Sequence, residues 1–457
     1  MQSAMIRSKY ILLLCFYFYA MGLDAQARRP NIVLIYVDDM GIGDVSYTGG
    51  RELPTPNIDQ LAKEGKVFTK YYSNAPVCSP SRVAITTGMY PLRWNINTFL
   101  SGQQHNQICE QAAYLADEAP SLARTLKASG YKTAHFGKWH MGGGRRIIAP
   151  SITQYGFDEY ASTWESPDPD PLLTASNWIW SPEDSIKRWE RTAYFVDKTL
   201  DFLARHAGQP CYINLWPDDI HSPWVADGAA LRADKQAYFS FDNLEPVIDL
   251  FDQEIGRLMK GLEALGVSEH TLLILTSDNG PAPTFERKRT HGLRGAKNSL
   301  YEGGIKMPFI IHWPSTIEAS QVDSISVISA VDLFPSLCKI GGAKMPTEYS
   351  LDGENVSQLL IGGKTRKRKR KLFWEYGRLN PKYSIPKEPN NRSLPLAVRD
   401  GRWKFFVSFD GSKTELYDLQ QDPNETQDLS DSQPRLIRKL KRVALQWFEK
   451  NDRSEVK

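Results

Sequence analysis

Four short, mostly apolar runs recur along the chain, and each ends in a cluster of polar side chains. The runs are Ile32–Val37, Lys132–Phe136, Cys211–Trp216 and Thr271–Thr276. Their apolar side chains are consecutive rather than alternating, which is typical of strands buried on both faces of a sheet. The pattern therefore predicts a sheet with helices packed on both sides.

Helical patterns lie between these runs. One helix is expected over Pro120–Ser129, with Gly130 beyond its end. A second runs through Phe195, Leu200 and Leu203 to Gly208. A third has apolar residues on one face from Val247 to Leu265 and stops at Gly266. Strands that alternate with helices predict an α/β fold with a large, doubly wound sheet flanked by helices.

After about residue 365 the pattern changes to short strands and a closing helix. The expected strands are Leu372–Tyr376, Trp403–Val407 and Glu415–Leu419, and the basic amphipathic helix is Pro434–Asn451. We expect a small antiparallel sheet with one helix, packed against the main domain. The predicted division is a catalytic α/β domain over residues 28–363 and a C-terminal subdomain over residues 364–457.

Residues 1–27 have the pattern of a secretory signal peptide. Two basic residues precede the apolar stretch Tyr10–Leu23, and Ala25-Gln-Ala27 resembles a cleavage site. Fourteen apolar residues are few for a membrane span. We therefore expect an exported protein, periplasmic or secreted, without stable membrane insertion.

Composition excludes several classes of protein. The chain has 457 residues, is 41% hydrophobic and carries a net charge of +3, which argues against disorder and gives no reason to expect nucleic-acid binding. The basic run Lys364–Lys371 is interpreted as a solvated loop between the domains, because export makes a nuclear localisation signal improbable. Five cysteines are too few for a disulfide scaffold, and pairing among Cys109, Cys211 and Cys338 stays open.

The polar clusters all follow predicted strands, so they are expected at one edge of the sheet, where ligands bind in such folds. Asp38 and Asp39 follow the first strand, and Asp278 and Asn279 follow the last. These four side chains offer only oxygen ligands, which favours Ca²⁺ or Mg²⁺ over zinc.

Cationic and titratable side chains form a second group in these clusters: Lys138, His140, His221 and Lys297. Beside a divalent metal they would form a site for a tetrahedral oxyanion, with imidazole available for proton transfer. His291 is left open between a substrate contact and a loop residue. No role is assigned to the other five histidines, which are His105, His135, His206, His270 and His312.

The segment Cys78-Ser-Pro-Ser-Arg82 is the most specific feature. Pro80 is expected to be the first residue of a helix that ends at Gly88, which places Cys78 near a helix N-terminus, where anions are favoured. From composition alone, the preferred interpretation of Cys78 is a structural cysteine or half of a disulfide with Cys109, Cys211 or Cys338.

This segment resembles the signature of type I, formylglycine-dependent sulfatases of the alkaline-phosphatase-like superfamily. The similarity spans nearly all of residues 30–430 and implies a mixed sheet and a sulfuric ester hydrolase. Further blocks similar to that family follow in order: Asn31–Gly41, Thr55–Asp59, Gly137–Gly142, Thr276–Gly280, Leu293–Lys297, Glu302–Gly304, Val331–Pro335 and Leu416–Pro423.

The resemblance implies that Cys78 is oxidised to Cα-formylglycine by a separate formylglycine-generating enzyme, and that the hydrated aldehyde is the nucleophile. One Ca²⁺ ion is expected on the residue at position 78 together with Asp38, Asp39, Asp278 and Asn279.

Each remaining candidate also has an implied role. Arg82 would stabilise the nucleophile, Lys138 and Lys297 would clamp the sulfate, His221 would protonate the departing alcohol, and His140 would accept the proton of the remaining hydroxyl. The implied substrate-binding residues are Lys138, His221, Lys297 and His291.

The implied reaction is hydrolysis of a sulfate ester on a carbohydrate. The segment Trp216–Pro223 departs from the family pattern, because Pro217 is displaced and two aspartates, Asp218 and Asp219, are inserted. Trp164, Trp178, Trp180 and Trp189 lie among carboxylates in residues 142–190, a composition suited to sugar rings. The alternatives are a phosphonate monoester or phosphodiester hydrolase, or an inactive homologue that binds sulfated glycans.

Overall fold

The computed structural model describes residues 29–452, apart from residues 51, 145–146, 174–180, 182, 229–238 and 379–385. The predicted signal peptide, and with it Cys15, lies outside these residues, as do Trp178 and Trp180. Within the described residues, no helix is both long and apolar enough to cross a bilayer. Their four cysteines are free thiols, so none of Cys109, Cys211 and Cys338 is paired here.

An eight-stranded sheet forms the centre, in the order β10-β2-β9-β7-β1-β6-β4-β5. The predicted runs are its adjacent strands β7 (Thr271–Ser277), β1 (Asn31–Val37), β6 (Cys211–Trp216) and β4 (Lys132–Gly137). These four strands are parallel, as is the edge strand β5 (Glu159–Ser162). The prediction of strands buried on both faces is confirmed, because all seven residues of β1 are buried.

Antiparallel pairing makes the sheet mixed. Strand β9 (Phe309–His312) runs antiparallel to β7 and to β2 (Lys66–Phe68), and β10 (Gln321–Asp323) pairs with β2. A second sheet of three very short strands, in the order β11-β3-β8, lies beside it: Ile328–Ser329, Tyr71–Tyr72 and Lys306–Met307. Strands of two or three residues carry too little pattern to be predicted from sequence.

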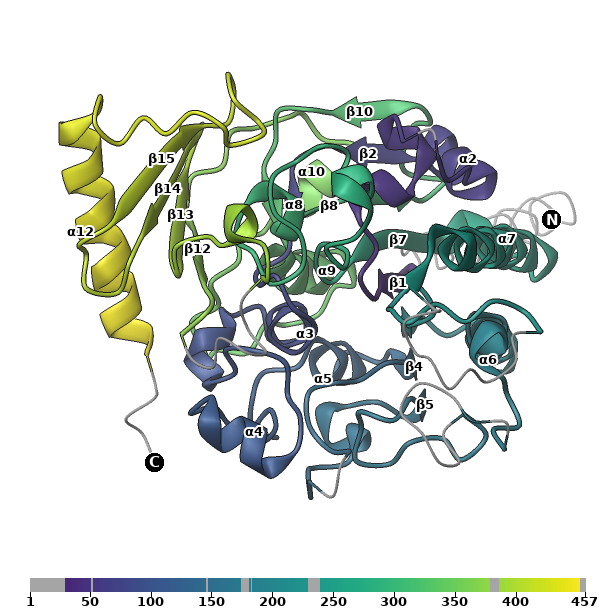
Figure 1. Ribbon diagram of the computed structural model, residues 1–457. Helices are drawn as coiled ribbons and strands as arrows, with labels where there is room; N and C mark the ends of the chain where they lie inside the picture. Colours follow the sequence, from purple (N-terminus) through teal and green to yellow (C-terminus); the bar gives the residue numbers. More distant parts are fainter. Residues whose placement is uncertain are drawn as a thin grey trace, which may run out of the picture.

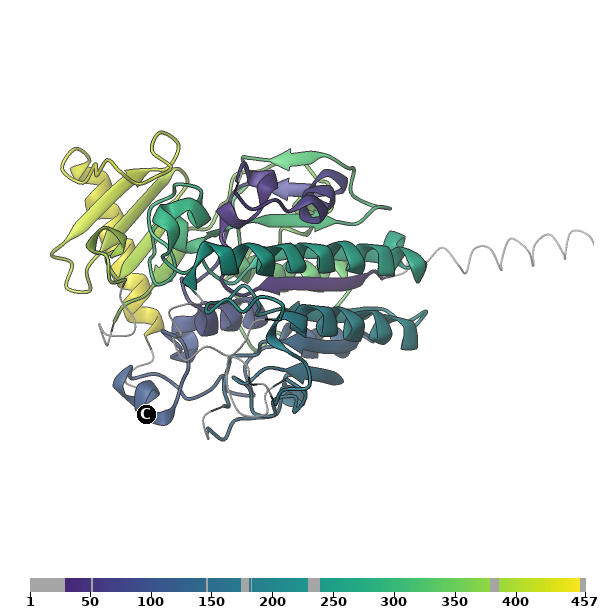
Figure 2. The same ribbon diagram turned by 45° about the vertical axis from the view of Figure 1, so that its right-hand side comes forward.

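Helices cover both faces of the large sheet (Figures 1 and 2). Ile32, Leu34 and Tyr36 of β1 pack in one core with the helices α3 (Cys78–Thr87), α5 (Leu122–Lys127) and α9 (Leu333–Ile340). The alternate residues of β1 pack in a second core with α2 (Pro56–Glu64), α6 (Arg191–Arg205) and α7 (Phe241–Ala264). The doubly wound α/β prediction is therefore confirmed. Short helices complete the fold: α4 (Gln103–Ile108), α8 (Glu302–Ile305) and α10 (Ser357–Leu360).

The C-terminal part is a four-stranded antiparallel sheet with α12 (Pro434–Asn451) against it, at the left of Figure 1. Its strands are β12 (Leu372–Glu375), β13 (Leu396–Asp400), β14 (Trp403–Val407) and β15 (Thr414–Asp418). The predicted antiparallel sheet and closing helix are confirmed, and β13 is an additional strand.

Two predicted helix starts are wrong by about two residues. Helix α3 begins at Cys78, so Pro80 lies inside its first turn rather than at its first position. Helix α5 begins at Leu122, because the Ser121 hydroxyl caps it by accepting the Arg124 N–H. The earlier start of α3 makes Cys78 itself a residue of the first turn.

Candidate active site

The carboxyl ends of the four parallel strands bring the predicted polar clusters to one place. Asp38 and Asp39 follow β1, Asp278 follows β7, Lys138 follows β4, and a loop after β6 carries His221. One ligand atom each from Asp38, Asp39, Cys78 and His221 lies within 4.8 Å of the others. Helix α3 presents Cys78 to this group from its first turn.

Cys78 is buried, and three charged groups lie near its sulfur. Its Sγ lies 3.3 Å from Asp38 Oδ1, 3.5 Å from Lys297 Nζ and 3.6 Å from Lys138 Nζ. Burial, reinforced by the Asp38 carboxylate, raises the pKa of the Cys78 thiol well above its ordinary value. An unmodified cysteine here is therefore a neutral thiol, and the thiolate is the form that acts as a nucleophile.

The two lysines approach Cys78 from different elements and stay protonated. Lys138 Nζ lies 2.6 Å from Asp38 Oδ2, and Lys297 Nζ lies 2.7 Å from both oxygens of Asp39. Burial alone lowers the pKa of each ammonium, but the adjacent carboxylate outweighs it and raises both above the ordinary lysine value. Two ammonium groups beside Sγ suit a bound oxyanion.

Three buried carboxylates and one amide supply the oxygens of the expected metal site. Asn279 donates from Nδ2 to Asp39 Oδ1 at 2.7 Å, while its own Oδ1 is buried without a hydrogen-bond partner among the described residues. Burial and the neighbouring Asp38 carboxylate raise the pKa of Asp278 to about 7. Crowded carboxylates with an unsatisfied amide oxygen fit a hard divalent cation such as Ca²⁺.

Arg82 contacts the carboxylates and the backbone rather than the thiol. Its Nη2 donates to Asp278 Oδ2 at 2.7 Å, and its Nη1 donates to the Lys138 carbonyl at 2.7 Å. The guanidinium is fully buried. It therefore compensates the Asp278 charge and ties the loop after β4 to α3.

The two candidate histidines differ in tautomer. His140 Nε2 lies 2.9 Å from the Leu100 carbonyl, so Nε2 carries the proton, and the buried Nδ1, without a partner among the described residues, is a proton acceptor. His221 Nδ1 lies 2.7 Å from the Ser222 carbonyl, and its Nε2 lies 3.0 Å from Lys297 Nζ. Burial and the Lys297 charge lower the pKa of His221 to about 4.

Two site residues adopt a left-handed backbone that only a few per cent of non-glycine residues show. The φ angles are 60° at Asp39 and 52° at His140. Such strain persists only where surrounding contacts hold it, and it gathers at functional sites. At Asp39 those contacts include Arg289, whose Nη2 donates to the Asp39 carbonyl at 3.0 Å and to Asp44 Oδ2 at 2.7 Å.

The inserted aspartates form a buried support for His221. Asp218 Oδ2 accepts from Arg188 at 2.8 Å and from Arg191 at 3.0 Å, and Arg188 Nη2 also donates to the His221 carbonyl at 3.0 Å. Asp219 instead binds Thr192 of α6. Sequence reasoning missed Arg188, Arg191 and Arg289. The one signal in the sequence is the Asp218-Asp219 insertion, because two adjacent buried carboxylates require cations or hydrogen-bond donors beside them.

His291 lies elsewhere. It lines a cavity of about 340 Å³ with Gly49, Phe241 and Arg289, and no contact described in the structure joins it to Cys78. Its suggested substrate contact stays a prediction.

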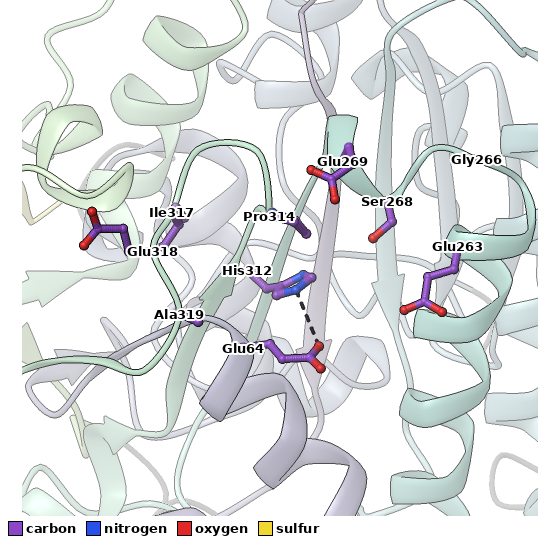
Figure 3. A pocket seen from close by; sticks show the side chains of 10 residues that line it. All are labelled: Glu64, Glu263, Gly266, Ser268, Glu269, His312, Pro314, Ile317, Glu318 and Ala319. Atoms are coloured by element: carbon purple, nitrogen blue, oxygen red, sulfur yellow. Dashed lines mark ion pairs between the residues drawn. The ribbon is translucent and has the colours of Figure 1, made fainter.

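A larger cavity, of about 660 Å³, is acidic and lies away from this site (Figure 3). Four glutamates line it around His312, whose Nε2 lies 3.8 Å from Glu64 Oε2. Glu269 precedes β7, whereas Asp278 follows it, so the two sites are separated by a seven-residue strand, about 23 Å.

Comparison with protein families identifies this arrangement. The Sulfatase family matches residues 30–343, and the C-terminal region of N-sulphoglucosamine sulphohydrolase matches residues 291–448. N-acetylgalactosamine-6-O-sulfatase of Bacteroides thetaiotaomicron is 27% identical, with 91% of this chain and 92% of the relative covered. Human N-acetylgalactosamine-6-sulfatase is 30% identical, with 75% of this chain and 68% of the human protein covered.

Solved structures have the same fold. A protein of glycosaminoglycan metabolism from Bacteroides thetaiotaomicron superposes with a TM-score of 0.74 at 23% identity, covering 93% of this chain and all of that one. The protein Ps i-CgsB, in complex with k-i-k-neocarrahexaose, superposes with a TM-score of 0.73 at 24% identity, covering 93% and 94%. The chain therefore belongs to the alkaline-phosphatase-like sulfatase family and is a sulfuric ester hydrolase.

Proposed function

We propose that this sulfatase hydrolyses sulfate esters of carbohydrates, with a formylglycine at position 78 and one Ca²⁺ ion. The observation that carries the proposal is the pair of lysine ammonium groups, 3.5 and 3.6 Å from Cys78 Sγ, at a site that also gathers three carboxylates. Fixed positive charge beside the reacting atom stabilises a sulfuryl group as charge develops on its oxygens.

The carbohydrate part of the proposal rests on the relatives. Two are N-acetylgalactosamine-6-sulfatases by name, and a structural neighbour was solved with a neocarrahexaose. The sulfated saccharide is therefore the proposed substrate.

Asp38, Asp39, Asp278 and Asn279 would hold the ion, together with the residue at position 78. Bound Ca²⁺ would polarise the sulfate oxygens, and formylglycine, made from Cys78 by a formylglycine-generating enzyme during export, would supply an oxygen nucleophile. The neutral state of the buried thiol supports this modification, because the unmodified residue lacks a reactive thiolate.

The chain's own side chains would bind the sulfate and move protons. Lys138 and Lys297 would bind the sulfate oxygens. Arg82 would hold Asp278 and the loop after β4 in place beside α3. His221 Nδ1 faces the Ser222 carbonyl, so Nε2 is the ring nitrogen that would deliver a proton to the departing alcohol oxygen. His140 Nδ1, held in its unprotonated state by the Leu100 carbonyl, would accept a proton later in the cycle.

The boundary near residue 364 and export to the periplasm or beyond are parts of the same proposal. The change from a mixed to an antiparallel sheet between β10 and β12 supports the boundary. The N-terminal apolar stretch supports export.

The proposal is tested with protein from a host that makes formylglycine. Sulfate release from a panel of sulfated mono- and oligosaccharides should be detectable, and Cys78→Ala should reduce it to background. Peptide mass spectrometry should find formylglycine at position 78. Active protein with an unmodified Cys78 would contradict the mechanism, and faster turnover of aryl phosphonate or phosphodiester than of aryl sulfate would favour the alternative reaction.

Removal of the metal provides a second test. Chelated protein should lose activity and melt at a lower temperature, and added Ca²⁺ should restore both, because a ligand that binds only the folded state stabilises it by about 2.7 kcal/mol at 100 times its Kd. The variant Asp278→Asn should show a smaller rise in Tm with Ca²⁺. Restoration by Zn²⁺ but not by Ca²⁺ would refute the assignment.

A further inference from the structure

The basic run between α10 and β12 is the charged feature that the proposed reaction leaves unused. Seven of the eight residues from Lys364 to Lys371 are Lys or Arg, and arginines alternate with lysines from position 366 to 371. Residues 363–369 are neither helix nor strand.

The arginines of this run are anchored to the main domain. Arg368 binds both carboxylate oxygens of Asp332, one of them at 2.9 Å, and its side chain is 6% exposed. Arg366 donates to the Asn355 carbonyl at 3.0 Å, and Arg370 donates to the Asp352 carbonyl at 3.2 Å. The interpretation of the run as a solvated loop is therefore wrong for Arg368, whereas Arg366 and Arg370 are exposed.

The lysines between these arginines are on the solvent side. Lys367 and Lys369 are exposed, and no carboxylate among the described residues pairs with them. Lys371 and Lys439 of α12 lie 3.5 and 3.6 Å from the same Asp400 oxygen, which joins the run to the helix. We define the basic strap surface as these lysines and the exposed arginines beside Lys439 on α12: Lys367, Lys369, Lys371, Lys439, Arg435, Arg438 and Arg442.

We propose that the basic strap surface binds the sulfated polysaccharide chain outside the active site. The inference rests on the proposed carbohydrate substrate. Cations spread along an extended segment and a helix suit a linear polyanion better than a single anion, because binding gains from the release of its condensed counterions. A membrane fits less well, since α12 packs Leu440 and Ala444 into a core with the sheet instead of presenting an apolar face.

The basic strap surface is connected to the C-terminal end of α3, whereas Cys78 lies at the N-terminal end of that helix. Arg370 binds the loop at Asp352, and the Asp352 N–H in turn donates to the Gly88 carbonyl at the end of α3, at 3.0 Å. Cys78 begins that ten-residue helix, so the two ends are about 15 Å apart. A polymer can contact both regions and gain effective concentration at the active site, whereas a small ester cannot.

The test compares charge-matched variants of the holoenzyme. Lys367→Gln combined with Lys369→Gln removes two charges from the strap, and Lys63→Gln with Lys260→Gln removes two exposed charges from α2 and α7. Each protein is eluted from immobilised heparin with salt, and kcat/KM is measured on a sulfated polysaccharide and on an aryl sulfate.

We expect the strap variant alone to elute at lower salt and to lose at least threefold in kcat/KM on the polymer, with aryl sulfate turnover unchanged. The slope of log affinity against log salt should fall by roughly one for each lysine removed. Equal elution of the two variants would overturn the proposal. It would also be overturned if the strap variant kept its heparin binding but lost binding to duplex DNA or to phosphatidylserine vesicles. If wild-type protein hydrolyses no sulfate ester, the proposed function fails, while the elution difference still decides the role of the surface.

Discussion

At the scale of single residues, the site balances its charges in pairs. Asp38, Asp39 and Asp278 are matched by Lys138, Lys297 and Arg82, so each buried carboxylate has a cation within 2.7 Å. A metal ion on the same oxygens would compete with the two lysines and leave their ammonium groups to bind sulfate. The charge pattern thus suits both a metal and an anion.

His140 provides a residue-scale prediction. The variant His140→Asn should lower kcat by about 10²- to 10⁴-fold, because it removes the Nδ1 acceptor while asparagine tolerates the left-handed backbone. The control is His270→Asn, at an exposed position before β7. Steady-state kinetics with an aryl sulfate measures both, and an unchanged kcat in His140→Asn would remove this residue from the mechanism.

The sequence reveals some of these residues but not others. Asp38, Asp39 and Asp278 directly follow buried strands, so their place at the sheet edge could be predicted, and the family resemblance supplied their roles. Arg289 could not be found, because it meets Asp44 across 245 positions in the sequence. Such pairs depend on tertiary structure and leave no local pattern.

At the scale of elements, α3 couples Cys78, the proposed nucleophile position, to the rest of the fold. The helix ends at Gly88, whose φ of 67° is left-handed and whose N–H donates to the Ala84 carbonyl. A Cβ on Gly88 would lie 2.8 Å from Phe334 Cβ of α9. Both the backbone conformation and the packing therefore require glycine here.

Gly88→Ala should destabilise the protein by about 2–4 kcal/mol, of which about 1 kcal/mol comes from the left-handed backbone and the rest from overpacking. Gly266→Ala is a close control, since Gly266 also has a φ of 67° but would place its Cβ in open space. Urea unfolding of both variants measures the difference. Equal losses would show that Phe334 moves aside without cost.

Elements were predicted best where burial imposes a continuous pattern. The strands β1, β4, β6 and β7 were located to within a residue at each end, because both faces of each are covered. The predicted start of α3 is two residues too late, because proline is common at the first helical position. In the structure Val77 is the capping residue, and Pro80 is the third residue of the helix. The short strands β2 and β10 depend on pairing with distant segments, β2 with β9 and β10 with β2, which leaves no local pattern in the sequence.

At the scale of the whole molecule, buried charges join the two sheets. Lys404 of β14 lies 2.9 Å from Glu302 Oε1 of α8 and 2.9 Å from Glu425 Oε1, and all three side chains are buried. Glu425 Oε2 also accepts the Glu302 N–H at 2.6 Å. Because α8 follows Lys297 closely in sequence, this cluster ties the C-terminal sheet to the segment that carries Lys297, a proposed sulfate ligand.

The two carboxylates beside Lys404 differ in how readily they ionise. Burial and the Glu302 charge, opposed by Lys404, raise the pKa of Glu425 to about 7, whereas burial is outweighed by Lys404 at Glu302, whose pKa falls to about 2. Between the ordinary glutamate pKa and about 7, the folded protein thus keeps a proton on Glu425, whereas the unfolded chain has released it. The contribution of this group to stability is full below pH 4.5 and declines as the pH rises to about 7.

Glu425→Gln should remove this decline, because glutamine keeps the acceptor for the Glu302 N–H but cannot ionise. Between pH 5 and pH 8 the free energy of unfolding should fall by on the order of 1–3 kcal/mol more in wild type than in the variant. Urea unfolding at the two pH values measures this, with the exposed Glu449→Gln of α12 as the control. Parallel pH dependence in wild type and Glu425→Gln would mean that Lys404 stabilises both carboxylates as ions, and that the contact between the sheets does not depend on a proton.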